Sequence, residues 1–358
     1  MSVIDIAPAT SPIAAVRDAF VGGRGYLSAC TLGLPPRAAR DALRADVDAV
    51  SAGRPDPVRY SAAVERSREL FASLVNVDRT RVAVGSQVSV LGALVATAVP
   101  DGGEVLVPEG DFSSVALPFV HAGRGLRVRA VPLARLADAI GPGTALVAFS
   151  NVQSATGAVA DTDAILAAAA AHGARTYCDA TQAVGWLPVD ASRFDALACH
   201  SYKWLCAPRG AAFLTLAESF ADAVRPLHAG WYAGADPWSS CYGHEVELAS
   251  DASRFDVSPA WQSFLAAEAS LELFASLDPA ALHAHATGLA AAFRARLGLG
   301  EETRASAIVT WADPDGADLA RLSAAGLTAS GRAGRARVAF HVFNDAEDVE
   351  LAARALGR

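Results

Sequence analysis

The sequence predicts an α/β fold built on a mostly parallel sheet between about residues 80 and 215. Short β-rich runs alternate there with helical segments, and several of the runs are apolar at nearly every position. Continuous apolar runs are typical of strands that are buried on both faces of a parallel sheet. Between two of these runs, residues 161–172 form a helical segment with Asp161 or Thr162 as its N-cap and Gly173 as its stop. Strand, helix and strand at this spacing form a βαβ unit.

The other elements follow from the same signals of apolar periodicity and of turn residues. The seven strands of the sheet are expected at residues 81–84, 104–107, 126–131, 145–149, 175–178, 195–199 and 211–214. Helical segments are expected at residues 35–52, 61–74, 88–97 and 261–297 and from Asp345, and a Gly-, Trp- and Pro-rich loop at 229–243. Two further strands, near 307–311 and 337–342, complete a small unit. We divide the chain into an N-terminal segment (1–22), a large α/β domain (23–256) and a small C-terminal α+β domain (257–358).

Composition excludes several classes of partner. The 358 residues include 52% hydrophobic residues, enough for a large core, and the formal net charge of −8 argues against nucleic acid or an anionic membrane as partner. Five scattered cysteines show no CxxC pair and no zinc spacing, so we expect no metal and free thiols in a reducing cytoplasm. The N-terminus lacks the charged and apolar regions of a signal peptide, which also favours a cytoplasmic location.

Lys203 is the single lysine of the chain, since 29 of the 30 Lys and Arg residues are arginines. A lysine amine can lose its proton and attack a carbonyl, whereas the guanidinium of arginine stays protonated. One hypothesis is therefore that Lys203 forms a Schiff base. The alternative is that a bias towards Arg and Ala left one lysine by chance, and the neighbours of Lys203 decide between the two.

Polar residues gather where three of the predicted strands end. Asp179 follows one strand, His200 ends another with Lys203 three residues later, and Ser86 and Gln87 lie between a third strand and a helix. Ligand-binding groups of parallel sheets gather at this edge. Each residue alone also has a structural explanation, as a helix cap, a core residue or a tight turn. Together they supply what pyridoxal phosphate requires: a lysine, a carboxylate for the pyridine nitrogen, amides at a helix N-terminus for the phosphate, and an aromatic cover.

The motifs around these residues resemble those of the class V aminotransferase family. The resemblance rests on Cys178-Asp179-Ala-Thr-Gln182, on His200-Ser-Tyr-Lys203-Trp-Leu with Pro208-Arg-Gly210, and on segments from Tyr26 to the C-terminal helix. The family includes cysteine desulfurases, kynureninases and isopenicillin-N-epimerase-like proteins. The resemblance implies the fold type I architecture of pyridoxal phosphate enzymes, a homodimer with shared active sites, and a small-molecule amino-acid substrate.

The resemblance also implies roles for particular residues. Lys203 carries the cofactor as an internal aldimine and then moves the proton at the substrate α-carbon. Asp179 pairs with the pyridine nitrogen, and Gln182 hydrogen-bonds the phenolic oxygen or the aldimine region. His200 and Tyr202 reach the phosphate.

Further positions that match the family complete the implied site. Ser86 and Gln87 lie in the phosphate loop, Phe112 stacks on the cofactor ring, and the segment with Gln153 approaches the cofactor oxygen. Ser258 takes the place of the residue that binds the phosphate in the partner subunit. Arg337 corresponds to the arginine that binds the substrate α-carboxylate, a task that suits a bidentate guanidinium.

The chain is therefore expected to be a pyridoxal phosphate enzyme that acts on an α-amino acid through Lys203, similar to class V aminotransferases. A β-eliminating C–S lyase of the ergothioneine type is the main alternative, and kynureninase-like or epimerase-like activity stays open. Cysteine desulfurases carry a catalytic Cys shortly before the arginine at position 337, but residues 329–336 contain none, which disfavours that activity. A non-catalytic regulator is disfavoured because the lysine, the aspartate and the phosphate loop are all present.

Overall fold

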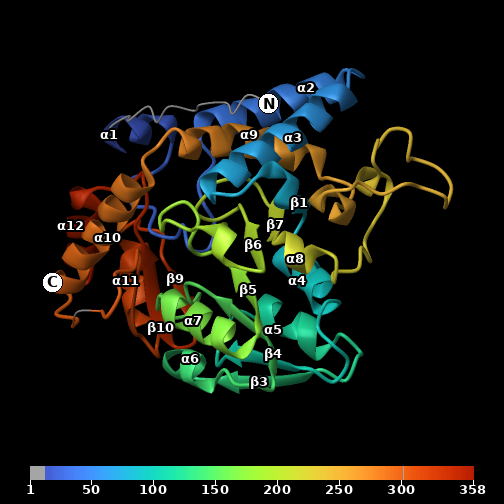
Figure 1. The fold of residues 1–358 in the computed structure, drawn as a ribbon. Helices are drawn as coiled ribbons and strands as arrows, with labels where there is room; N and C mark the ends of the chain where they lie inside the picture. The colour runs from blue at the N-terminus through green and yellow to red at the C-terminus, as the bar shows by residue number, and fades with distance from the viewer. Residues whose placement is uncertain (1–12, 301) are drawn as a thin grey trace.

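The computed structural model describes residues 13–300 and 302–358, and a seven-stranded sheet forms its centre (Figure 1). The strands lie in the order β1–β7–β6–β5–β4–β2–β3, and every neighbouring pair is parallel except the two that involve β7. Their bounds are β1 Val82–Gly85, β2 Glu104–Pro108, β3 Arg127–Val131, β4 Thr144–Ser150, β5 Arg175–Asp179, β6 Ala196–His200 and β7 Ala212–Leu216. The predicted mostly parallel sheet is confirmed, and six strands end at the same edge.

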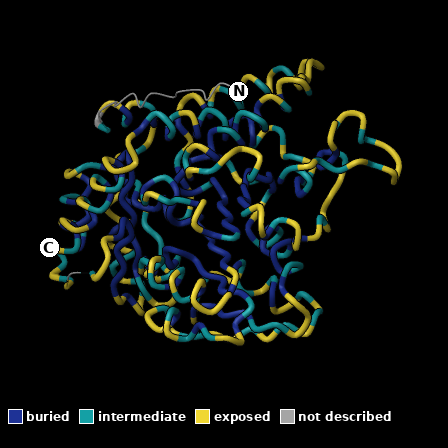
Figure 2. Tube along the Cα trace, in the orientation of Figure 1, coloured by how far each residue is buried: buried dark blue, intermediate teal, exposed yellow. Residues whose placement is uncertain are grey.

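Helices cover both faces of this sheet, which explains the continuous apolar runs. On β6, Leu197 and Cys199 pack with one set of helices, whereas Ala196 and Ala198 belong to a second core on the other face. The first set is α3 Pro57–Leu74, α7 Thr162–His172 and α9 Trp261–Ala275, and the second is α4 Val88–Ala96 and α5 Ser113–Val120. Apart from the edge strand β3, whose residues are exposed or half-buried, the strands of this sheet are accordingly buried at nearly every position (Figure 2).

Local signals explain where the helices begin and end. The Asp161 side chain accepts the Ala164 N–H at 3.2 Å, and Gly173 ends α7 with a left-handed φ of 68°, as predicted. Helix α3 begins four residues before the predicted start, because Asp56 caps it and Pro57 fits the first turn. The other helices before and beside the sheet are α1 Ile13–Val16, α2 Arg37–Ser51, α6 Leu136–Ala139 and α8 Glu218–Ala221. In the part of the chain that the structure describes, no helix has the length and apolar character of a membrane span.

A second, antiparallel sheet lies in the C-terminal part of the chain, in the order β8–β10–β9. Its strands are β8 Ile308–Ala312, β9 Ser330–Arg332 and β10 Arg335–Ala339, and its helices are α10 Pro279–Arg296, α11 Ala317–Ala324 and α12 Ala346–Ala355. Strand β9 was not predicted, because Ser-Gly-Arg has no apolar pattern and forms a strand only by pairing with β10. The strand predicted at 337–342 begins and ends earlier, at Arg335 and Ala339.

The loop after β7 projects from the body of the molecule (the gold segment in Figure 1). It contains the 3-10 turn Trp231–Ala233 and a bridge between Gly234 and Leu248. Trp238 and Tyr242 are exposed in it, with 51% and 93% of their surface accessible. Such exposure of large aromatic groups marks this loop as a surface available for contact.

Candidate cofactor-binding site

A cavity of about 130 Å³ lies at the carboxyl ends of the parallel strands. Seven of the residues predicted for the site line it, and so do six that were not predicted. The predicted ones are Gln87, Phe112, Asp179, Gln182, His200, Tyr202 and Lys203, and the others are Val88, Ser114, Ser150, Ser154, Thr181 and Arg209. The fold therefore brings the single lysine and the carboxylate into one enclosed space, as the strand-end pattern predicted.

The turn that carries Lys203 is held by two close backbone approaches. The Gly33 N–H donates to the Tyr202 carbonyl at 2.9 Å, and a Cβ on Gly33 would lie 2.0 Å from the Lys203 carbonyl oxygen. From another side, a Cβ on Gly185, whose φ is 113°, would lie 2.5 Å from the Trp204 carbonyl oxygen. Only glycine permits either approach. These two contacts fix the lysine turn, and the sequence alone did not reveal them.

The Lys203 amine is poised to lose its proton. Its side chain is buried, and this burial lowers the pKa of Lys203 to about 8, although the nearby Asp179 charge opposes the change. The Nζ atom lies 5.4 Å from the centroid of the Phe112 ring and 5.5 Å from that of Tyr202. A substantial neutral fraction of the amine is therefore present at mildly alkaline pH.

Asp179 is the last residue of β5 and is also buried. Its Oδ1 accepts the Thr181 N–H at 2.9 Å, while the hydroxyl of Thr181 accepts the N–H of His200 at 3.0 Å. Burial raises the pKa of Asp179, and the hydrogen bonds from Thr181 and the charge of Lys203 act against that rise. A buried carboxylate is stable as an anion only beside a cation, so it suits a protonated ring nitrogen placed against it.

Other residues of the cavity lining suit an anion. Helix α4 begins at Val88, and its N-cap Gln87 makes no side-chain cap, so the first amides of the helix are free to bind a phosphate. The Arg209 guanidinium lies 4.5 Å from the centroid of the Tyr202 ring at this cavity. Burial and the charge of Arg209 lower the pKa of His200 to about 3, and its Nε2 accepts the Gly210 N–H at 3.3 Å. His200 is thus a neutral hydrogen-bonding group, and Arg209 supplies the charge.

Ser154 connects two predicted residues, Gln182 and Arg337, that lie far apart in the sequence. Its hydroxyl accepts the Gln182 amide Nε2 at 3.0 Å and Arg337 Nη1 at 3.3 Å, and its carbonyl also accepts Arg337 Nη1. Gln182 also donates to the Cys30 carbonyl at 2.9 Å and accepts the Trp204 Nε1–H at 2.8 Å. Gln182 therefore positions the lysine turn against Cys30, and its predicted contact with the cofactor stays a prediction.

Arg337 is a buried cation whose hydrogen bonds all go to neutral oxygens. Only 1% of its surface is exposed, and besides Ser154 it donates to Thr31 Oγ1 at 2.8 Å and Ser330 Oγ at 3.1 Å. No carboxylate within the described ranges forms an ion pair with it. A guanidinium that is buried without a counter-ion is destabilised until an anion arrives, so the geometry suits the predicted carboxylate binding.

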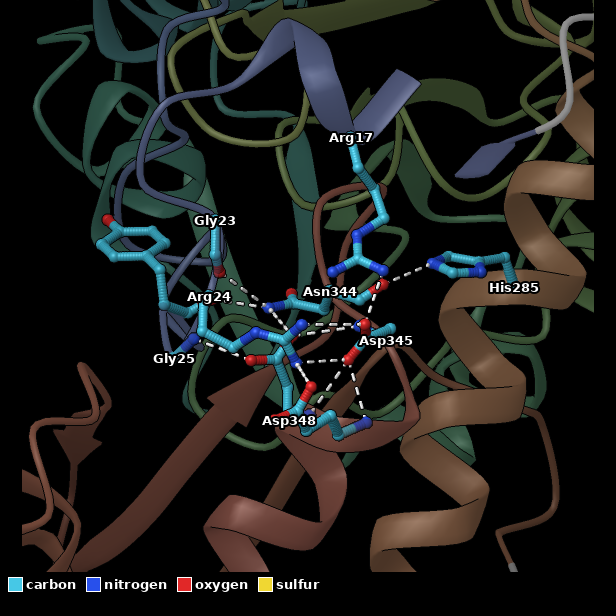
Figure 3. A network of polar contacts seen from close by, with 10 residues as sticks. Arg17, Gly23, Arg24, Gly25, His285, Asn344, Asp345 and Asp348 are labelled. Atoms are coloured by element: carbon cyan, nitrogen blue, oxygen red, sulfur yellow. Dashed lines mark hydrogen bonds and ion pairs between the residues drawn. The ribbon is translucent and has the colours of Figure 1, made fainter. Parts of the chain in front are cut away.

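The segment that brings Thr31 to Arg337 is anchored by a polar network on the C-terminal part of the chain (Figure 3). The Asn344 amide donates to the carbonyl of Gly23 at 3.3 Å, and Asp348 accepts the Gly25 N–H at 2.7 Å. Arg17 and Arg24 both pair with Asp345, which caps α12. Gly23 and Gly25 are therefore held against the C-terminal part of the chain, several residues before Thr31.

Three other predicted residues lie outside the cavity lining. Ser86 immediately precedes Gln87, and the buried Gln153 donates through Nε2 to the Ser150 carbonyl at 3.3 Å. Ser258 is exposed and accepts the Trp231 Nε1–H at 3.2 Å. Arg337, described above, is a fourth predicted residue outside the lining, and it contacts the lining residue Ser154. The roles assigned to these residues stay predictions.

The residues present fit pyridoxal phosphate. A lysine of lowered pKa, a buried carboxylate, an aromatic cover and an anion-binding helix start face one cavity, which is the donor set that this cofactor needs. Arg209 supplies a charge to the cavity lining and lies in the motif Pro208-Arg-Gly210, but the sequence analysis did not predict it as a site residue. Among the described residues, no cluster of three or more His, Cys, Asp or Glu is arranged to hold a metal.

The chain matches the model of the family "Aminotransferase class-V" over residues 52–311. It belongs to this family and is a pyridoxal-phosphate-dependent enzyme. Its fold is that of fold type I enzymes, since it superimposes with a TM-score of 0.81 on a cystine C–S lyase in complex with cysteine persulfide, with 21% identity and coverage of 93% of this chain and 97% of the other. A cysteine desulfurase from Escherichia coli also gives a TM-score of 0.81, at 19% identity and 98% coverage of both chains.

Particular curated relatives match over shorter stretches. The chain is 31% identical to the isopenicillin N epimerase of Streptomyces clavuligerus over 183 residues, which cover 46% of each protein. It is 30% identical to the kynureninase of Deinococcus radiodurans over 246 residues, which cover 65% of this chain and 59% of that enzyme. The chain thus spans about half the length of curated relatives that it matches.

Proposed function

We propose that this enzyme acts on an α-amino acid and that Lys203 forms the covalent bond to its cofactor. The observation that carries the proposal is that the single lysine of the chain lies in one cavity with Asp179, at the ends of the neighbouring strands β6 and β5. An amine of lowered pKa beside a buried carboxylate is the pairing that this cofactor requires.

Each side chain then has a definite task. When bound, the cofactor acts as an electron sink that acidifies the α-carbon of the amino acid. Asp179 holds the proton on the pyridine nitrogen, and Phe112 covers the ring. The free amine of Lys203 takes and returns the α-proton, for which a pKa of about 8 is well matched. The α4 amides, His200, Tyr202 and Arg209 hold the phosphate, and Arg337 orients the α-carboxylate.

We also propose a homodimer in which Ser258 completes the phosphate site of the partner. Ser258 is exposed and is not part of its own cavity lining, and its hydroxyl accepts the Trp231 Nε1–H of the projecting loop. A second copy that covers this loop would bury its exposed aromatic groups.

The five unpaired cysteines support the proposed cytoplasmic location.

The reaction proposed first is of the class V aminotransferase type, with a β-eliminating C–S lyase as the alternative. The relatives named above are an isopenicillin N epimerase and a kynureninase, so similarity in sequence alone does not fix the reaction. A persulfide-forming desulfurase is disfavoured, because residues 329–336, which precede Arg337, include no cysteine. Cys206 cannot take this role from its position, since it is buried beside His341.

A panel of amino acids, supplied with and without a 2-oxo acid, tests this function. Conversion of the bound cofactor to its amine form, followed by recovery with the 2-oxo acid, supports transamination. Release of pyruvate and a thiol supports the lyase. A purified protein that stays colourless and takes up no pyridoxal phosphate refutes the assignment of the site.

A further inference from the structure

Three arginines share one face of the small sheet. In the antiparallel register of β9 and β10, Arg332 lies opposite Arg335, and Ser330 lies opposite Arg337. Residues directly opposite each other in an antiparallel pair point to the same side, as do residues two apart on one strand. Arg332, Arg335 and Arg337 therefore project from the same face.

This face is turned toward the large domain. The alternate residues Ala336 and Val338 pack into the core formed with α10, α11 and α12. On the arginine face, Thr310 lies opposite Arg337 and donates to the Thr156 carbonyl at 3.1 Å. Thr156 belongs to the same loop as Ser154, which lines the lysine cavity. The arginine row thus borders the site.

A tight turn fixes Arg332 at the end of the hairpin. The two connecting residues, Ala333 and Gly334, both have left-handed φ angles, of 49° and 71°. This is the conformation of a two-residue type I′ hairpin, and it is unfavourable for alanine. The turn leaves no freedom in the register, so the backbone of Arg332 is held opposite that of Arg335.

The partners of the three arginines differ in an informative way. Arg337 donates only to neutral oxygens, as described above, and Arg335 donates to the hydroxyl and carbonyl of Thr310 at 3.1–3.2 Å. Arg332 is exposed, and its hydrogen bond goes to the carbonyl of its own neighbour Gly331 at 2.7 Å. None of the three pairs with a carboxylate within residues 13–300 and 302–358. Like charges on one face repel each other, so an anion that bridges them is stabilised.

The charge of Arg332 reaches the lysine cavity. Burial is the main cause that lowers the pKa of Lys203, and the charges of Arg337 and Arg332 lower it further. Burial likewise accounts for most of the lowered pKa of Arg337, to which Arg332 adds. Arg332 is therefore close enough to act on groups at the site, although it lies outside the cavity lining.

We propose that Arg332 binds an acidic group at the end of the substrate side chain, so that the substrate is an α-amino acid with a distal carboxylate. The inference rests on the proposed function, in which Arg337 takes the α-carboxylate and Lys203 faces the α-carbon. The second carboxylate then meets the one guanidinium of the row that has no partner beyond its own hairpin. An exposed arginine suits a group that projects from the cavity toward its mouth, and a planar guanidinium binds a carboxylate through two parallel hydrogen bonds.

The test compares acidic substrates with their amides. In the wild-type holoenzyme we expect kcat/KM for aspartate or glutamate to exceed that for asparagine or glutamine by about 10- to 100-fold, the range of a charged hydrogen-bonded contact. Arg332→Gln should remove most of this preference by raising KM for aspartate and glutamate. The kcat/KM values for asparagine and glutamine and the cofactor absorbance should stay unchanged. Arg332→Lys should retain part of the preference, because lysine keeps the positive charge but lacks the two parallel N–H donors of the guanidinium. Arg321→Gln, an exposed arginine on α11 of the same domain, is the matched control.

A binding measurement without turnover separates the outcomes. Calorimetry with succinate and with its monoamide succinamate should show the same preference for the dianion in the wild type and its loss in Arg332→Gln. A wild type that turns over neutral amino acids at least as well as acidic ones overturns this inference and leaves the proposed function in place. An equal preference in Arg332→Gln and Arg321→Gln also overturns it. A holoenzyme that acts on no amino acid refutes both the role of Arg332 and the proposed function.

Discussion

Two arginines of this chain are almost completely buried, and they are buried in different ways. Arg68, on α3, is 2% exposed and forms a bidentate pair with Asp256, with contacts of 2.6 and 3.2 Å. It also pairs with Glu65 at 3.0 Å. Arg337, on β10, is 1% exposed and meets only hydroxyl and carbonyl oxygens.

The difference is visible in the direction of the pKa shifts. Burial lowers the pKa of Arg68, but the charge of Asp256 more than offsets it, so that the pKa is raised. Burial lowers the pKa of Arg337, and no carboxylate offsets it. A buried charge with its own counter-ion serves the fold, whereas one without a counter-ion keeps its binding capacity for a ligand.

The paired arginine stabilises the edge strand β1, which directly precedes Ser86 and Gln87. Arg68 donates to the Val82 carbonyl, and Asp256 accepts the Val84 N–H at 2.7 Å, so the pair joins α3, β1 and the segment that carries Ser258. Arg68→Met leaves Asp256 buried and unpaired, and should lower the free energy of unfolding by about 3–5 kcal/mol in urea titrations. Arg68→Met combined with Asp256→Asn should recover most of the loss. If the single variant is as stable as the wild type, Arg68 does not serve the fold.

The unpaired arginine should show the opposite pattern. Arg337→Gln is expected to weaken binding of the amino-acid substrate about 100-fold, since hydrogen bonds to charged groups contribute roughly 1.5–3 kcal/mol. Its free energy of unfolding should equal or exceed that of the wild type, because an uncompensated buried charge is removed. Titration of substrate into the holoenzyme and urea unfolding measure the two effects. A stability loss as large as that of Arg68→Met would remove the distinction between the two arginines.

The charge of Asp179 acts on Lys203 and gives a pH dependence of known sign. The neutral amine attacks the cofactor, so the rate of cofactor uptake by the apoprotein should rise with pH and level off above about 8, the lowered pKa of Lys203. The charge of Asp179 raises the pKa of Lys203, so Asp179→Asn should move this midpoint to lower pH. Stopped-flow absorbance measures the rate. A midpoint near 10, or one that rises in the variant, contradicts the assignment.

Partly exposed ion pairs should contribute least. Asp345 caps α12 and pairs with Arg17 and Arg24 in the network of Figure 3. Asp345→Ala should lower the free energy of unfolding by only about 1 kcal/mol, mostly through the lost cap. Substrate affinity should stay within about twofold, because Asn344 and Asp348 still hold Gly23 and Gly25. A large loss of affinity would show that this network controls the site directly.

The sequence predicted the sheet well because strands buried on both faces leave continuous apolar runs. It also predicted which residues lie at the strand ends, and therefore that Asp179, His200 and Lys203 meet. It did not predict β9, whose three residues carry no apolar pattern. It could not predict the arginine face either, because that face depends on the register between β9 and β10.

Contacts between distant segments were also beyond the reach of the sequence. Gly33 reads as an ordinary loop glycine, yet it lies against the Lys203 carbonyl. Ser154 reads as one small residue among several, yet it joins Gln182 to Arg337. Local patterns report periodicity and turns, whereas such contacts arise only from tertiary packing.

The most direct test of the lysine site uses the fact that the chain has one lysine. The purified enzyme is loaded with pyridoxal phosphate, reduced with borohydride and weighed intact by mass spectrometry, with Lys203→Arg treated in parallel. We expect one pyridoxyl phosphate adduct per wild-type chain and none in the variant, which keeps the charge but has no reactive side-chain amine. A wild type without an adduct, or an equal adduct in Lys203→Arg, would contradict the assignment of Lys203 as the residue that carries the cofactor.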